Sequence, residues 1–92
     1  MGLNKETAAR LADARLAEWH RVSYGEWRAL LDDKDIRQIV GEDGERYTVV
    51  SYALDDGDER IRMVVAVDDR GGSAFVPLVR DEIMMPDGTF VE

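Results

Sequence analysis

Residues 47–67 read YTVVSYALDDGDERIRMVVAV, two apolar runs separated by an acidic stretch that contains one glycine. β-Branched and aromatic residues are frequent in both runs, which is typical of strands. An Asp-Gly pair between two such runs favours a tight hairpin. The segment therefore predicts an antiparallel pair, with strands at 47–54 and 61–67.

A tight turn in this hairpin also predicts which side chains share a face of the sheet. If Asp56 and Gly57 are the two turn residues, Tyr52 lies opposite Ile61. Alternate residues of both strands then form one apolar face, as expected when helices cover one side of an antiparallel sheet. The registers of the neighbouring strands stay open, because a one-residue change in loop length exchanges their faces.

Turn residues divide the rest of the second half of the chain into further short strands. Asp43-Gly44 marks a hairpin before the central pair, and Gly71-Gly72 marks a turn after it. Pro77 has no amide hydrogen to donate, so its strand is expected at a sheet edge or a bulge. The additional strands are predicted at residues 36–40, 74–79, 83–85 and 89–91, the last two joined by the turn Pro86-Asp87-Gly88.

The N-terminal third of the chain has helical patterning. A first helix is expected to begin near Asn4, a good N-cap residue, and to end near Trp19. One face of this helix carries a thin stripe in which alanine is frequent. The stripe consists of Ala8, Ala12, Leu16 and Trp19.

A second, shorter helix is predicted over residues 24–31. Ser23 and Glu26 have the spacing of a capping box, in which each side chain bonds the backbone amide of the other residue. This helix should direct Trp27, Leu30 and Leu31 toward the core. It should end before the acidic pair at 32–33, because anions are unfavourable at the negative end of a helix.

These elements predict a single α+β domain over residues 1–92, helical in 1–33 and built of strands in 35–91. The N-terminal helix and the short second helix should pack on one face of an antiparallel β-meander of about four to five strands. A chain of 92 residues has room for one modest core, and no linker divides it.

The composition excludes several classes of site. The chain has no cysteine, which rules out disulfides, thiolate catalysis and zinc bound through sulfur. No apolar run approaches the ~20 residues that span a bilayer, and the N-terminus lacks the apolar core of a secretory signal. We therefore expect a cytoplasmic protein.

The net charge of −8 is unevenly distributed. Residues 1–37 carry seven basic and seven acidic side chains, whereas residues 38–92 carry five basic and thirteen acidic ones. Phosphate backbones would be repelled by this surplus, so nucleic acid is not an expected partner. A basic protein is a more natural partner.

From Trp19 onward the chain resembles a group of short bacterial proteins with no assigned activity. The likeness lies in a Trp-His and Ser-Tyr start (WHRVSY, residues 19–24), an Asp-Asp-x-Gly-Gly turn (68–72), Pro77-Leu78 and a Pro-Asp-Gly-x-Phe-Val ending (86–91). In that group a glycine often precedes the last glutamate, whereas Val91 is followed directly by Glu92 here. The resemblance implies a compact bacterial domain and carries over no site residues.

One candidate ligand site is an aromatic cluster around the single histidine. His20 has the only side chain that titrates near neutrality without perturbation, and Trp19, Tyr24 and Trp27 lie close to it in the sequence. Together they could line a pocket. The competing interpretation is structural, because large rings supply much of the burial in a small domain and no acid–base partner for His20 is evident.

A second candidate is a cation site in the acidic turn, formed by Asp55, Asp56 and Asp58. Carboxylate oxygens suit calcium or magnesium, but the EF-hand spacing is absent. Aspartate is also a favoured turn residue in its own right, since its side chain bonds the local backbone. Solvated turns are the competing interpretation.

The leading functional hypothesis is a small acidic cytosolic domain for protein interaction or regulation, without catalysis and without a cofactor. It would present an acidic strand surface to a basic partner, or self-associate through the alanine-rich helix or a strand edge. The alternative is a small-molecule-binding protein or enzyme with a pocket near His20. A pocket with a carboxylate within hydrogen-bond reach of that ring would favour the alternative.

Overall fold

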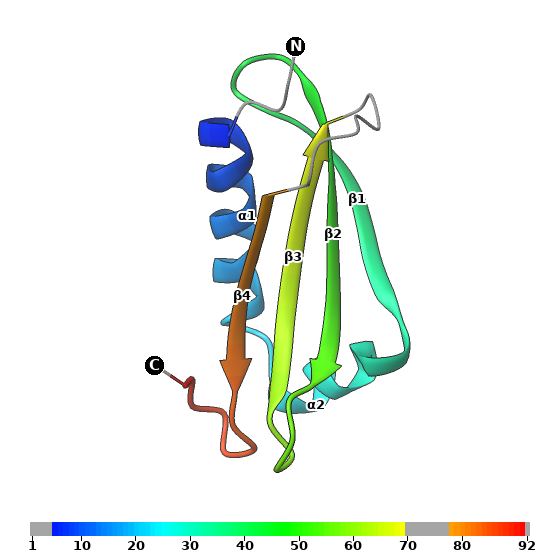
Figure 1. The fold of residues 1–92 in the computed structure, drawn as a ribbon, viewed down its shortest axis with the longest axis vertical. Helices are drawn as coiled ribbons and strands as arrows, with labels where there is room; N and C mark the ends of the chain where they lie inside the picture. Colours follow the sequence, from blue (N-terminus) through cyan, green and yellow to red (C-terminus); the bar gives the residue numbers. More distant parts are fainter. Residues whose placement is uncertain (1–4, 70–77, 92) are drawn as a thin grey trace.

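The computed structural model describes residues 5–69 and 78–91. In these residues the helices precede a sheet whose strand order is β1-β2-β3-β4, with every neighbouring pair antiparallel. The helices pack on one face of the sheet (Figure 1), which confirms the predicted α+β fold. The elements are α1 (Lys5–Trp19), α2 (Tyr24–Ala29), the 3₁₀ turn η1 (Leu30–Asp32), β1 (Lys34–Val40), β2 (Arg46–Asp55), β3 (Ile61–Asp69) and β4 (Leu78–Met84).

Helix α1 ends at Trp19, as predicted, and lies along β3 and β4 (Figure 1). Its predicted stripe faces the sheet, where Ala8 and Ala12 are fully buried and Leu16 is nearly so. Alanine is small, so the helix can approach the strands closely. The alanine-rich face is therefore occupied within the chain and is not a surface for self-association.

Helix α2 begins as the capping signal predicts. The Ser23 hydroxyl accepts a hydrogen bond from the Glu26 amide at 3.4 Å, which confirms one half of the capping box. The α-helix ends at Ala29, earlier than expected, and the chain continues as η1 before it enters β1. Trp27 is fully buried, so this short helix anchors one end of the core.

The first three strands begin and end within two residues of the predicted limits, but the fourth does not. β4 spans Leu78–Met84, so the segment 83–85 belongs largely to this strand instead of forming a separate one. The predicted segment 74–77, with Pro77, lies outside the described residues. The closing turn is confirmed: the Met85 amide donates to the Thr89 carbonyl oxygen at 2.7 Å, and Met84 pairs with Phe90.

The register of the central hairpin corrects the sequence prediction. Asp55 pairs with Ile61, so the connection is the longer loop 56–60. In this loop Gly57, Asp58 and Glu59 have positive φ angles of 85°, 53° and 64°. Relative to a two-residue turn, the pairing is displaced by an odd number of residues, which turns every β2 side chain to the opposite face.

The core face of β2 is therefore the one that the sequence prediction had placed outside. Tyr47, Val49, Ser51 and Ala53 are buried under the helices, and Tyr52 lies on the other face, half-buried. The face predicted for β3 is correct. Its buried residues are Ile61, Met63, Val65 and Val67.

Two tryptophans connect the helices to the sheet through hydrogen bonds. The Trp27 indole Nε1 donates to the Trp19 carbonyl oxygen at 2.9 Å, and the Trp19 indole Nε1 donates to the Ser51 hydroxyl at 2.9 Å. Ser51 is a fully buried polar residue in the centre of β2. The indole supplies the partner that its hydroxyl needs, because a buried hydroxyl without one would be destabilising.

Tyr47 makes the stability of the fold depend on pH. Its side chain is buried, and its hydroxyl donates to Asp43 Oδ2 at 2.5 Å. Burial, together with this hydrogen bond, raises the pKa of Tyr47 from 10.0 to about 12. In the unfolded chain the phenol ionises near its ordinary pKa, so the folded state holds the proton over a pH range in which the unfolded state has lost it.

We expect the free energy of unfolding to fall by about 1.4 kcal/mol per pH unit as the pH rises from about 10 to about 12. Below pH 10 this contribution is complete. Urea denaturation of the wild type and of Tyr47→Phe across this range measures the difference in slope, since phenylalanine has no proton to lose. Equal slopes for the two proteins would contradict the assignment.

Candidate functional site

The predicted aromatic cluster serves mainly to hold the fold together. Trp27 is buried, and Trp19 is half-buried beneath the Arg15 guanidinium, whose central carbon lies 4.5 Å from the ring centroid. His20 packs on Phe90, with 4.3 Å between ring centroids. The Trp27 ring also lies 5.8 Å from Phe90 and its Nε1 donates to the Trp19 carbonyl oxygen, so Trp19, His20 and Trp27 form one packed cluster, whereas Tyr24 lines a cavity apart from it.

His20 has one nearby carboxylate. Its Nε2 lies 3.5 Å from Glu82 Oε1, and both side chains are partly exposed to solvent. Two cavities lie elsewhere on the described surface, and Trp19, His20 and Trp27 line neither of them. The geometry therefore supplies an ion-pair partner for a protonated histidine, and neither of these two cavities reaches its ring.

Tyr24 lines the smaller of the two cavities, of about 230 Å³, between α2 and the β2–β3 loop. Its hydroxyl donates to the Glu59 carbonyl oxygen, which fixes the loop against the helix. Arg28 and Arg60 line the same cavity. The Tyr24 contact explains how a loop with three consecutive positive φ angles is held in place.

The acidic turn uses its carboxylates locally. Asp55 Oδ1 accepts a hydrogen bond from the Gly57 amide at 2.8 Å. Asp56 Oδ1 lies 3.1 Å from Arg62 Nη2, and Asp58 Oδ2 lies 3.8 Å from Arg60 Nη2. Among residues 5–69 and 78–91, no group of three or more acidic, histidine or cysteine side chains is arranged to hold a metal ion. The geometry gives no support to the hypothesis of a cation site formed by Asp55, Asp56 and Asp58.

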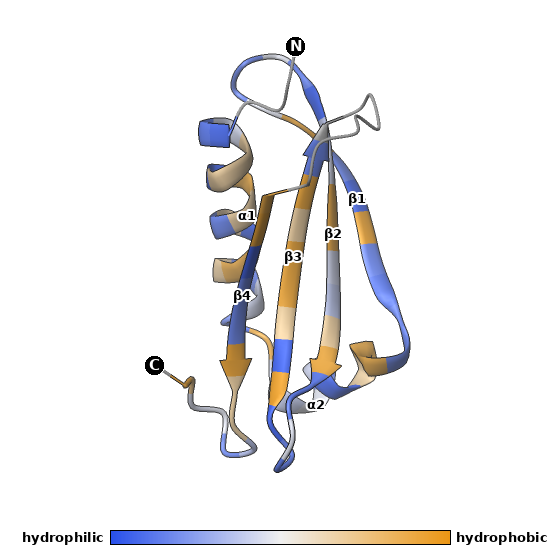
Figure 2. Cartoon of the chain, viewed as in Figure 1, coloured by the Kyte–Doolittle hydropathy of each residue, from blue (hydrophilic) through white to orange (hydrophobic). Residues whose placement is uncertain are grey.

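The face of the sheet opposite the helices carries a continuous apolar row. Ile36 pairs with Val50, Val50 with Ala66, and Ala66 with Val79, so one residue of each strand lies in line across the sheet. Ile36 is 58% exposed and Val79 is 46% exposed. Figure 2 shows hydrophobic residues along much of β2 and β3 and at intervals on β1 and β4. We call the side of the sheet that contains this row the open face.

A second row lies beside the first and ends in opposite charges. Lys34 pairs with Tyr52, Tyr52 with Val64, and Val64 with Asp81. Val64 is buried between its neighbours, with 5% of its surface exposed. Asp81 forms an ion pair with Arg62, whereas Lys34 forms no ion pair with any described residue. The row is therefore apolar in the middle, with an unpaired cation on β1 and a carboxylate on β4.

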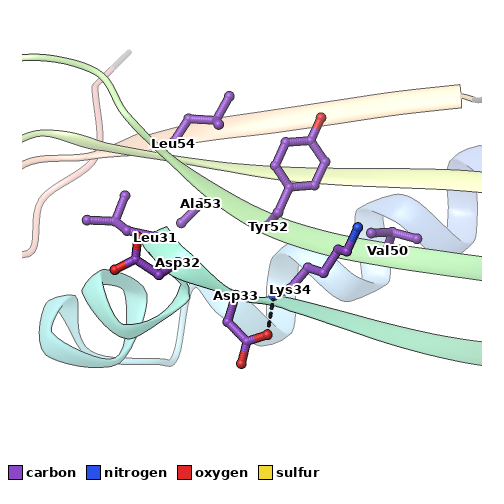
Figure 3. A pocket seen from close by; sticks show the side chains of 8 residues that line it. All are labelled: Leu31, Asp32, Asp33, Lys34, Val50, Tyr52, Ala53 and Leu54. Atoms are coloured by element: carbon purple, nitrogen blue, oxygen red, sulfur yellow. Dashed lines mark hydrogen bonds between the residues drawn. The ribbon is translucent and has the colours of Figure 1, made fainter.

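The larger cavity, of about 600 Å³, lies at the β1 corner of this face (Figure 3). Leu31 of η1 forms one side of it, and Val50, Tyr52 and Leu54 of β2 extend along it. Lys34 lies at its edge, where its backbone amide donates to Asp33 Oδ1 at 2.8 Å. Apolar residues line most of the cavity, and Asp32, Asp33 and Lys34 add charged groups on its η1–β1 side, so the cavity continues the open face instead of forming a separate site.

The acidic surplus lies mainly at the ends of the strands. Glutamates and aspartates are concentrated in the loops around 42–45 and 55–59. On the open face, Lys34, Arg46 and Arg62 are set against Asp68 and Asp81. That face is apolar in its central row and close to charge balance, and an acidic rim lies at its two ends.

The comparisons with known proteins give no family to which the chain could be assigned. No family model, curated protein or solved structure matches it. No helix in the part of the chain that the structure describes is long and apolar enough to cross a membrane. The surfaces themselves are therefore the basis for a functional inference.

The open face does not follow from the predicted register, which places Val50 and Tyr52 in the core. One signal in the sequence does point to it. Residues 63–67 (MVVAV) form an uninterrupted apolar run, and strands that are covered on both faces have such runs, whereas strands with one solvated face alternate.

Proposed function

We propose that this chain is a small protein-interaction domain without catalysis, and that its binding surface is the open face of the sheet. The observation that carries the proposal is the row from Ile36 to Val79, which leaves aliphatic side chains of both edge strands about half exposed. Contiguous apolar surface of this kind on a small protein marks interaction sites.

The packing of the sheet supports this reading. The helices cover one face, yet β3 carries apolar residues on both faces, with Val64 and Ala66 on the open side. An antiparallel sheet that keeps one face in water normally alternates polar and apolar residues. Covering the open face with an apolar partner surface would remove the exposed parts of Ile36, Leu54 and Val79 from water, which is favourable in proportion to the area buried.

The charge pattern restricts the kind of partner. An acidic rim around an apolar face disfavours polyanions such as nucleic acid and favours a protein surface that is apolar in the centre and basic or neutral outside. The absence of cysteine fits a reducing cytosol as the setting. The alternative of an enzyme with a pocket at His20 has a nearby carboxylate in its favour, but His20 lines neither of the two cavities described above.

A photo-reactive phenylalanine derivative placed at single positions tests the proposal in cells that make the protein. The derivative at Ile36 lies on the open face, and the same derivative at Ala17, an exposed position on α1, is the matched control. We expect discrete adducts from position 36 that persist at high salt, and none from position 17. Failure to form an adduct at 36, or equal labelling at 17, would overturn the proposal.

A further inference from the structure

We propose that the partner on the open face is a second copy of this chain, with the two sheets face to face and a two-fold axis parallel to the strands. This inference rests on the proposed function of the open face. It adds the identity of the partner and the geometry of the complex, both of which follow from how the residues of two neighbouring rows are ordered across the sheet.

The axis determines which strands meet. A rotation about a line that runs parallel to the strands, between β2 and β3, places β1 over β4 of the second copy and β2 over β3 of the second copy. In the apolar row, Ile36 then faces Val79, and Val50 faces Ala66. Aliphatic side chains meet aliphatic side chains along the whole row, as in aligned sheets packed about 10 Å apart.

The same rotation makes the charged ends of the second row complementary. Lys34 of one copy comes opposite Asp81 of the other, and symmetry creates this contact twice. Asp81 already accepts from Arg62 of its own chain and has a second oxygen available, whereas Lys34 has no carboxylate partner among the described residues. In the dimer the Lys34 ammonium group, which has no carboxylate partner among the described residues, would gain Asp81 of the second copy as one.

The corner cavity has a counterpart on the opposite edge of the sheet. Leu54, which lines the cavity, shares a row with Arg62 and Ile83, so Ile83 lies at the β4 end of that row on the open side. The two-fold axis brings Ile83 of the second copy over the cavity beside Leu31. Ile83 thus meets the apolar side of the hollow, formed by Leu31, at two symmetric corners.

A two-fold axis perpendicular to the strands fits the charges less well. It would place β1 over β1, so that Lys34 faced Lys34, Ile36 or Gln38 of the second copy, depending on the height of the axis. Asp81 would likewise lie over β4 of the second copy, away from Lys34. At none of these heights does the Lys34 ammonium group come opposite Asp81, so this charge pairing is specific to the parallel axis.

The size of the face indicates a weak dimer. Four strands about 4.8 Å apart, with seven residues rising about 3.3 Å each, form a face of roughly 19 by 23 Å, so two copies bury on the order of 1,000 Å². Stable specific interfaces usually begin at about 1,200 Å². We therefore expect dissociation in the micromolar range.

Sedimentation equilibrium of the purified chain, from about 1 to 300 µM, tests whether a second copy binds. We expect a mass that rises with concentration toward twice 10.4 kDa. Val79→Asp should weaken the dimer at least about tenfold, whereas Ala17→Asp on the exposed side of α1 should not. A strict monomer throughout this range, with circular dichroism showing a folded chain, would overturn the inference.

Cysteine cross-linking tests the direction of the axis, because the natural chain has no cysteine to interfere. A short bismaleimide should join Ile36→Cys to Val79→Cys when the two variants are mixed. It should join neither variant to itself, since two copies of position 36 lie about three strand spacings, or ~14 Å, apart across the sheet. Efficient cross-linking of Ile36→Cys alone would overturn the proposed geometry.

A charge exchange gives an independent test of the second row. Lys34→Asp or Asp81→Lys alone should each raise the dissociation constant about tenfold, because like charges then meet twice. The double variant should return to within about threefold of the wild type. Arg62 keeps Asp56 at 3.1 Å as its local partner in these variants. No recovery in the double variant would count against the parallel axis.

The two proposals can fail separately. The photo-reactive derivative at Ile36 in purified protein should give an adduct of twice the chain mass. If the purified chain gives none, while cells give an adduct of another mass from position 36 and not from position 17, the open face binds a different protein and the second copy is excluded. If neither gives an adduct, both proposals fall.

Discussion

Replacing Trp27 with alanine is expected to lower the free energy of unfolding by about 3–5 kcal/mol. The indole is fully buried between α2 and the sheet, and its ring lies 5.8 Å from the Phe90 ring centroid. Truncation leaves a cavity and also removes the donor that bonds the Trp19 carbonyl oxygen. A domain of this length has about 5–14 kcal/mol in total, so this single change would remove a large share of it.

Urea denaturation followed by far-UV circular dichroism measures this effect, and two further variants make it specific. Arg28→Ala changes an exposed residue of the same helix and should shift the free energy of unfolding by less than about 0.5 kcal/mol. Trp27→Phe keeps an aromatic ring and loses the indole donor. Its free energy of unfolding should therefore lie between those of Trp27→Ala and Arg28→Ala. Similar midpoints for Trp27→Ala and Arg28→Ala would show that the core does not depend on this ring.

Trp27 also illustrates what the sequence could predict. Its position follows from local chemistry: Ser23 caps the helix, and the helical period then directs Trp27 inward. Capping, helix period and strand composition act over a few residues, so they can be recognised without knowledge of the tertiary structure. The α+β class, both helices and the limits of the first three strands followed from such local signals.

The register of the central hairpin could not be predicted in the same way. Asp56-Gly57 has the composition of a two-residue turn, but Asp58 and Glu59 also adopt positive φ, which lengthens the loop. That conformation is held by a tertiary contact, the hydrogen bond from Tyr24 to the Glu59 carbonyl oxygen. Tyr24 and Glu59 are 35 residues apart, so the composition of the turn alone does not predict this contact.

Hydrophobicity did not correct the error, because both faces of β2 are acceptable as a core. The inward face carries Val49 and Ala53, and the outward face carries Val50 and Leu54. The hydrophobic pattern specifies the register of a strand only when its two faces differ clearly in polarity, because a one-residue slip exchanges the two faces. The ambiguity that misled the prediction is thus the property on which the proposed binding surface depends: the outward face is apolar enough to be buried.

Replacing Asp35 with alanine is the second change with a large expected effect, about 3 kcal/mol in the free energy of unfolding. Arg15 projects from α1 toward β1, where its Nη2 donates to Asp35 Oδ2 at 2.8 Å. The Arg15 side chain is 7% exposed and that of Asp35 is 31% exposed. Removing the carboxylate would leave a guanidinium buried between helix and sheet without its main counter-charge.

The second ion pair of Arg15 provides a matched control within the same site. Glu18 lies 3.5 Å from Arg15 Nη1, but its side chain is 58% exposed. Solvent screens such a pair, so Glu18→Ala should lower the free energy of unfolding by less than about 1 kcal/mol. Equal losses for Asp35→Ala and Glu18→Ala in urea denaturation would show that the burial of Arg15 does not set the energy of the pair.

A double variant separates the loss of a favourable contact from the creation of an unpaired charge. Arg15 Nε is buried without a hydrogen-bond partner among the described residues, so the guanidinium is incompletely satisfied even in the native chain. Combining Arg15→Met with Asp35→Ala removes this atom and the unpaired charge together. We expect the double variant to recover most of the stability lost in Asp35→Ala, since an apolar side chain of similar length can replace a buried ion pair at little net change in free energy. If the double variant is as unstable as Asp35→Ala, the carboxylate stabilises the α1–β1 contact through partners other than Arg15. The first such partner to test is Arg37, whose Nε lies 3.0 Å from Asp35 Oδ2.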